Sequence, residues 1–84
     1  MESSYRAVLQ RFPEYWSELT DLIGSDHRLL ELADDYERAR AAQGYWREHA
    51  DQQPERPVEY DGLVTALEEE IESLLEQERK RRPP

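Results

Sequence analysis

The sequence predicts an all-α protein: an antiparallel helical hairpin with one or two short N-terminal helices packed on it. Two long segments, about 26–48 and 58–81, repeat apolar side chains at alternating spacings of about three and four residues, which is typical of helices packed along one stripe. A short break containing two prolines joins them, so the two helices should lie antiparallel. No run of alternating β-branched residues indicates a strand.

Residues 1–24 are predicted to form the short N-terminal helices. Pro13 has no N–H and restrains the residue before it, so a first helix should end near residue 12. The same proline suits the first turn of a second helix, to about residue 23, and Gly24 should end that helix. The apolar sides of the two helices are Tyr5, Val8, Leu9 and Phe12, and then Tyr15, Trp16, Leu19, Leu22 and Ile23.

The first long helix is expected over 25–49, after the capping residues Ser25 and Asp26. Residues 50–57 are expected to form a turn. The second long helix should begin at about Val58 or Asp61 and run to Arg81 or Arg82, with residues 83–84 as a tail. The predicted stripes are Leu29, Leu32, Tyr36, Ala39, Gln43 and Trp46 on the first helix, and Tyr60, Val64, Leu67, Ile71, Leu74 and Glu78 on the second.

Composition limits the class of protein. The chain has 84 residues and a net charge of -9, which indicates one small domain. Leu, Ile, Val and Phe make up 16 of the 84 residues, few enough that a monomer should have a marginal core. The lack of cysteine and of a signal-like N-terminus favours a cytoplasmic protein. No apolar run is long enough for a membrane span, and the acidity makes nucleic acid an unlikely partner.

No pattern in the sequence indicates catalysis, a cofactor or a metal. His27 and His49 stand in no metal-binding spacing, and the three glycines form no phosphate-binding loop. The carboxylate pairs have no predicted concave apolar pocket that would shift their pKa values. We therefore expect a protein without catalytic, metal or cofactor residues.

Two aromatic pairs stand out, Tyr15-Trp16 and Tyr45-Trp46. Adjacent residues on a helix point about 100° apart, so one member of each pair should face the core and the other a second surface. That second surface is either the contact of the N-terminal helices with the hairpin or a subunit interface. The candidate interface residues are Tyr15, Trp16, Leu30, Tyr45, Trp46, Leu63 and Leu75, and a homodimer forming a four-helix bundle would bury them.

Charged segments offer a second set of candidates on the last helix. Its acidic face is either a solvated helix surface or a docking site for a basic protein, and it centres on Glu68, Glu69, Glu72 and Glu76. The basic run from Arg79 to Arg82 either favours the negative end of the helix dipole or contacts nucleic acid or an anionic membrane.

The run Arg11-Phe12-Pro13-Glu14-Tyr15, the later pair Leu22-Ile23, a long helix and a second helix led by Tyr60 resemble the YdcH-like family of small bacterial proteins. The resemblance implies an α-helical hairpin and no known activity. The acidic run at Glu68 to Glu70 departs from the lysine-rich second helix of that family.

Together these patterns predict a non-catalytic protein–protein interaction module that self-associates through its helical stripes. The alternative is an acidic inhibitor or mimic that docks on a basic, nucleic-acid-binding protein. Salt separates the two hypotheses, because a charged contact weakens steeply with ionic strength and an apolar dimer responds little.

Overall fold

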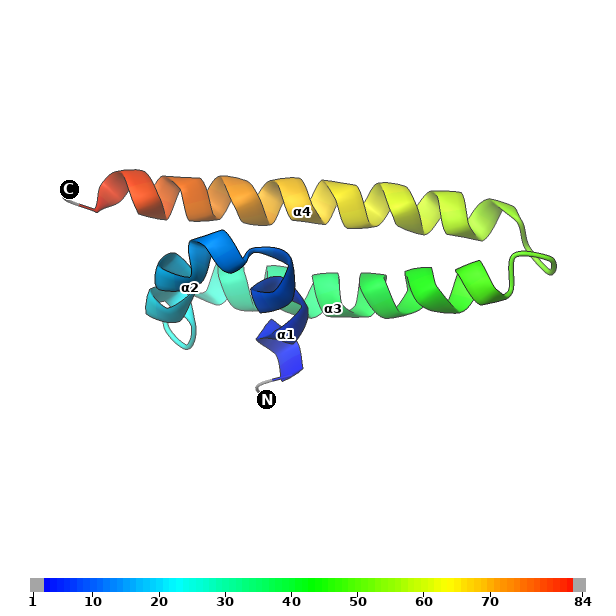
Figure 1. The fold of residues 1–84 in the computed structure, drawn as a ribbon, viewed down its shortest axis with the longest axis horizontal. Helices are drawn as coiled ribbons and strands as arrows, with labels where there is room; N and C mark the ends of the chain where they lie inside the picture. Colours follow the sequence, from blue (N-terminus) through cyan, green and yellow to red (C-terminus); the bar gives the residue numbers. More distant parts are fainter. Residues whose placement is uncertain (1–2, 83–84) are drawn as a thin grey trace.

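The computed structural model describes residues 3–82, with side chains from Tyr5 onward. Every regular element of these residues is a helix. These are α1 (Ser3–Arg11), the 3-10 helix η1 (Pro13–Tyr15), α2 (Trp16–Leu22), α3 (His27–Glu48) and α4 (Glu55–Arg81). Helices α3 and α4 lie side by side and antiparallel, and the short elements pack at the end of the hairpin away from its turn (Figure 1). The predicted all-α antiparallel hairpin is confirmed. The predicted tail, 83–84, lies outside the described residues.

The breaks between the short helices follow the local chemistry of the sequence. Phe12 has a non-helical backbone, with φ of -123° and ψ of 57°, because the following proline disfavours the helical conformation, and Pro13 opens η1. Gly24 has a φ of 86°, a left-handed conformation that glycine adopts without strain, and it follows the end of α2. The Asp26 carboxylate then accepts a hydrogen bond from the Leu29 N–H at 3.0 Å, which caps α3.

The turn of the hairpin is shorter than the sequence predicts. Helix α4 begins at Glu55, before the predicted start at Val58 or Asp61. Pro57 therefore lies inside the first turn of α4 rather than in the turn of the hairpin. The first turn of a helix tolerates proline because its N–H groups have no acceptor within the helix, so this proline does not mark the helix boundary.

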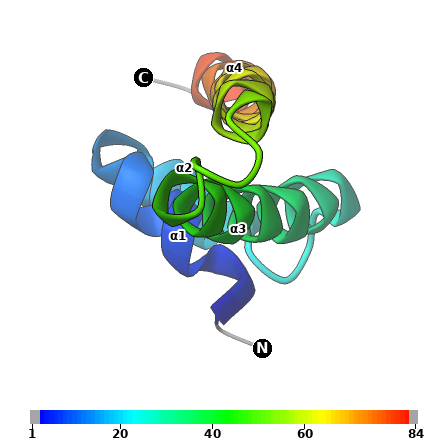
Figure 2. The same ribbon diagram turned by 90° about the vertical axis from the view of Figure 1, so that its right-hand side faces the viewer.

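The hydrophobic core occupies only one half of the hairpin. On α3 the buried residues end at Ala39, and on α4 they begin at Val64. This half is where α1, η1 and α2 pack, and we call it the covered end. Figure 2, which looks along the hairpin from its turn, shows these short elements beside and beneath α3. The largest fully buried side chains are Val8, Phe12, Leu19, Leu29, Tyr36, Ile71 and Leu75.

Leu75 corrects one prediction. The sequence predicts that it is one of the apolar residues of a subunit interface, but the structure buries it completely within the monomer. Because α2 packs against α4 at the covered end, α4 there faces two neighbours instead of one. Its buried stripe is therefore wider than the single heptad stripe and includes Leu75 beside Ile71.

We expect Leu75→Ala to lower the free energy of unfolding by about 2–4 kcal/mol, because it removes buried methyl groups and leaves a cavity. Val58→Ala serves as the control, since Val58 is 72% exposed, and should change stability by less than about 0.5 kcal/mol. Urea unfolding followed by circular dichroism measures both. Equal, small effects would place Leu75 on the surface, as the sequence predicts.

Candidate protein-interaction surface

The two aromatic pairs each divide between an inner and an outer side chain. Tyr15 is buried while Trp16 is 60% exposed, and Tyr45 is 51% exposed while Trp46 is half-buried. Near the turn, the Tyr45 ring stacks on the His49 ring with centroids 4.1 Å apart. The prediction that one member of each pair faces the core holds for Tyr15, whereas Trp46 is only half-buried and lies outside the core.

Tyr15 is no longer a candidate for a subunit interface, because its contacts lie within the chain. Its hydroxyl donates a hydrogen bond to the Glu76 carboxylate at 3.2 Å, and the Arg79 guanidinium lies 4.2 Å from the centre of its ring. Burial and the bond to Glu76 raise the pKa of Tyr15. Tyr15 therefore holds η1 against α4.

Glu18, which no sequence pattern marks, is the one buried charged residue found in the described chain. Arg79 Nε donates to the Glu18 carboxylate at 3.0 Å and Arg79 Nη2 donates to the Glu14 carbonyl at 2.9 Å. The bond from Arg79 and a backbone hydrogen bond hold the pKa of Glu18 below its usual value, although burial opposes them. No spacing pattern in the sequence could have revealed this pair, because its members lie far apart in the chain.

Arg82 extends this contact. Its guanidinium donates to the Ser17 hydroxyl at 2.9 Å and to the Ser17 carbonyl at 3.0 Å, and it pairs with Asp21. Two of the four cations of the basic run, Arg79 and Arg82, thus bind the N-terminal segment. The basic run therefore serves in part to bind the end of α4 to α2 within the chain.

The predicted acidic face is also partly used inside the molecule. The Tyr36 hydroxyl donates to the Glu68 carboxylate at 2.6 Å, and Arg11 Nε donates to the same oxygen at 3.2 Å. Burial and the bond to Glu68 raise the pKa of Tyr36. Of the four predicted residues, Glu69, Glu72 and Glu76 are exposed without an ion pair among the described residues. Glu76 accepts the hydrogen bond from Tyr15, so only Glu69 and Glu72 are without either contact.

A shallow apolar groove of about 480 Å³ runs between α3 and α4, and it extends to the half of the hairpin nearer the turn. Its lining is Asp35, Arg38, Ala39 and Ala42 on α3, and Tyr60, Leu63 and Leu67 on α4. Tyr45 continues the α3 side by about one helical turn beyond Ala42. We call this lining together with Tyr45 the open face.

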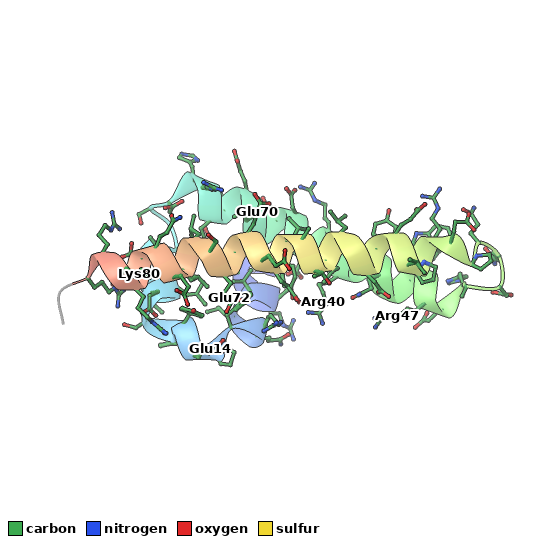
Figure 3. The ribbon with its side chains drawn as sticks, turned by 90° about the horizontal axis from the view of Figure 1, so that it is seen from above. Glu14, Arg40, Arg47, Glu70, Glu72 and Lys80 are labelled. Atoms are coloured by element: carbon green, nitrogen blue, oxygen red, sulfur yellow. The ribbon has the colours of Figure 1, made fainter. Side chains whose placement is uncertain are left out.

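The open face lies on the side of the hairpin away from the short helices. In Figure 3, Glu70 lies on one side of α4, and Glu14, Arg40 and Arg47 lie on the other. Leu63, Leu67 and Glu70 share one face of α4 by their spacing. The Glu14 side is polar, because Gln43 and Arg47 both donate to the Asp61 carboxylate there, at 2.8 and 3.2 Å. The hairpin therefore has a polar side, which carries the Asp61 contacts, and an opposite side with the apolar groove.

The remaining candidate interface residues do not join the open face. Trp16 is exposed on α2 at the covered end, and Leu30 lines a separate small groove of about 90 Å³ beside Tyr5 and Gly24. The predicted set thus separates into buried residues, isolated exposed residues and one continuous surface. Of the set, the open face contains Tyr45 and Leu63.

Comparison with protein-family models, curated proteins and solved structures found no match to the chain. The resemblance to the YdcH-like family therefore stays a prediction, as does the cytoplasmic location. Within residues 3–82, no helix is long and apolar enough to cross a membrane. The same residues contain no group of three or more His, Asp or Glu side chains that could hold a metal ion.

We expect Glu18→Gln to destabilise the protein at neutral pH and to do so less as the pH falls. A carboxyl with a lowered folded-state pKa stabilises the fold fully above its unfolded pKa of about 4.3, and the contribution disappears as the pH drops through the folded value. Urea unfolding at a series of pH values from neutral to strongly acidic measures the difference between the wild type and the variant.

Glu14→Gln is the matched control, because the structure shows Arg79 binding the Glu14 carbonyl and not its carboxylate. This variant should leave the pH dependence close to that of the wild type. A pH-independent effect of Glu18→Gln would contradict the assigned role of the Glu18 charge.

Proposed function

We propose that this chain is a non-catalytic protein–protein interaction module that self-associates through the open face. The observation that carries the proposal is the distribution of apolar residues. At the covered end they are buried within the chain, whereas nearer the turn Tyr45 and Leu63 of the open face remain 51% and 46% exposed. Scattered single apolar residues are ordinary on a surface, but a continuous patch between two helices is typical of an interface.

Energetics supports the same proposal. Burying a large apolar side chain contributes about 1.5–3 kcal/mol, and a small domain has only about 5 kcal/mol in total. Covering Leu63 and Tyr45 would therefore add a large fraction to the stability of this fold. An open two-helix layer that pairs with another such layer forms a four-helix bundle, a frequent solution for helices with one exposed apolar stripe.

The acidic docking hypothesis has less support, because Glu68 and Glu76 bind Tyr36 and Tyr15 inside the molecule. A basic partner would have to displace these contacts or use Glu69 and Glu72 alone. The open face requires no such displacement, since its Leu63 and Tyr45 side chains are already exposed.

We expect the wild-type chain to sediment as a dimer at micromolar concentration and Leu63→Glu to sediment as a monomer, because the variant places a charge in the apolar groove. Thr65→Glu is the matched control: it adds the same charge to the exposed outer face of α4 and should leave the dimer intact. Circular dichroism should show that both variants keep their helix content. A wild-type monomer of 10.0 kDa with a sharp thermal transition would overturn the proposal.

A further inference from the structure

Charges of opposite sign flank the open face on α4. Arg56 lies at the turn and Glu70 toward the covered end, and their side chains are 43% and 56% exposed. Within the chain Arg56 pairs with Glu59 at 3.5 Å, and Glu70 pairs with Arg28 at 3.8 Å. Exposed pairs of this kind contribute little to stability, so both groups keep the capacity to bind a further charge.

These two charges end a regular stripe of residues on α4. Spacings of four, three, four and three residues place the stripe along one face of the helix. Leu63 is its midpoint, seven residues from either end. The three inner members line the groove. The α4 stripe consists of Arg56, Tyr60, Leu63, Leu67 and Glu70.

A second stripe borders the open face on α3 and ends just past that helix. Its spacings are four, three, three and four residues, with Ala42 at the midpoint. Its ends are Asp35 and His49, whose ring stacks on that of Tyr45. A histidine ring nitrogen can donate a hydrogen bond to a carboxylate, so these two ends are also complementary. The α3 stripe consists of Asp35, Ala39, Ala42, Tyr45 and His49.

The midpoints of the two stripes lie at nearly the same level along the hairpin. The Tyr36 hydroxyl contacts Glu68, and the Gln43 side chain contacts Asp61. Seven residues forward on α3 thus correspond to seven residues back on α4. By this alignment the α3 midpoint, residue 42, lies level with about residue 62 of α4. That position is one residue, or about 1.5 Å, from the α4 midpoint.

The symmetry of a homodimer leaves two ways to bring the open faces together. The two-fold axis must lie in the plane between the faces, because only such an axis turns one face over onto the other. If the helices of both layers stay aligned, as in a four-helix bundle, the axis runs along the hairpin or across it. An axis along the hairpin stacks α3 of each copy on α4 of the other, with every residue at its own level. An axis across the hairpin stacks α3 on α3 and α4 on α4, both antiparallel.

Charge disfavours the axis along the hairpin. With every residue at its own level, Asp35 would lie opposite about residue 69 of the other copy, close to the exposed Glu69 and Glu70. Like charges placed opposite each other oppose association. The covered ends, which hold the acid excess, would also lie side by side. Arg56 of one copy and Glu70 of the other would stay at opposite ends of the groove.

The axis across the hairpin brings the opposite charges together. When it passes at the level of the two midpoints, each position of a stripe faces the position equally far beyond the midpoint on the other copy. Arg56 then faces Glu70, and Asp35 faces His49. Each of these contacts occurs twice, because the interface is symmetric. The covered ends lie at opposite ends of the bundle.

The apolar side chains fit the same alignment. Ala39 faces Tyr45 of the other copy, and a small side chain set against a large one is how facing helical layers interdigitate. On the axis, Leu63 meets the Leu63 of the other copy and Ala42 meets the other Ala42. The small alanine side chains let the two α3 helices approach closely at that point.

We propose that a second copy of this chain covers the open face about a two-fold axis that crosses the hairpin at Ala42 and Leu63, with each long helix antiparallel to its counterpart and Arg56 paired with Glu70 across the interface. The inference rests on the proposed self-association and adds its geometry. The apolar residues near the axis supply most of the affinity, while the charges at the ends of the stripes select the alignment.

Charge reversal tests the pairing of Arg56 with Glu70. Arg56→Glu should raise the dimer dissociation constant, measured by sedimentation equilibrium, at least about tenfold, because it sets like charges opposite each other at two places. Arg56→Glu/Glu70→Arg should return to within about threefold of the wild type. Arg47→Glu is the matched control, since it breaks a similar exposed ion pair, with Asp61, on the other side of the hairpin; it should leave the dissociation constant unchanged.

A single cysteine tests the position of the axis, and the natural chain has no cysteine to interfere. Ala42→Cys should form a covalent dimer on mild oxidation, because a residue on the axis lies next to its own counterpart. Ala41→Cys is the matched control: Ala41 is exposed and points about 100° away around α3, so this variant should stay uncrosslinked. An axis along the hairpin would hold the two α3 helices diagonally apart, and neither variant would crosslink.

The outcomes separate the two proposals. If Leu63→Glu disrupts a wild-type dimer but Ala42→Cys does not crosslink, or charge reversal does not weaken the dimer, self-association stands and this arrangement is overturned. Crosslinking of Ala41→Cys as readily as Ala42→Cys would also overturn it, because the contact would then lack the proposed alignment. A wild-type monomer at micromolar concentration would overturn both proposals.

Discussion

The docking of the short N-terminal segment on one end of the hairpin is the interaction on which the rest of the structure depends. Two antiparallel helices alone bury only one apolar stripe between them. Phe12 and Leu19 of the N-terminal segment, both fully buried, form a third side of the hydrophobic core. The segment is shorter than the hairpin, so its cover ends near Ala39 and Val64. The same limited supply of apolar residues thus produces both a compact core at one end and an open face toward the other.

Polar contacts hold this third layer in place. Arg79 and Arg82 reach from α4 to α2, and Tyr36 and Arg11 share the Glu68 carboxylate. The Glu18 carboxylate is buried while the Arg79 side chain is 49% exposed, and desolvation of the carboxylate offsets part of the attraction between them. The loss of one partner is nevertheless costly, and the pair's geometry is specific. The role best supported for the Glu18–Arg79 pair is to fix how α2 sits on α4, while the apolar contacts supply the cohesion.

Much of this fold follows from the spacing of apolar residues in the sequence and from the prolines and glycines that end its helices. The stripe from Leu29 to Ala39, the break at Pro13 and the left-handed Gly24 all depend on neighbours within a few residues, so a linear pattern specifies them. The burial of Leu75 and Glu18 depends on which segment covers them from a distance, and no local pattern encodes that. Pro57 misleads for a different reason: proline signals the first turn of a helix as readily as it signals a break. Part of the candidate surface, Tyr45 and Leu63, could be predicted from the sequence. Their exposure follows because the N-terminal segment is too short to cover the half of the hairpin nearer the turn.

The net charge of -9 raises an objection to self-association, since two copies repel each other. The distribution of charge answers it. The acid excess is concentrated at the covered end, where Glu69, Glu70 and Glu72 point away from the core. Around the open face, Asp35 and Glu59 are balanced by Arg38 and Arg56. Two copies that meet there bring together a surface on which these charges balance, and the acidic residues of the covered end lie outside it. The overall charge then opposes other modes of association more strongly than it opposes this one.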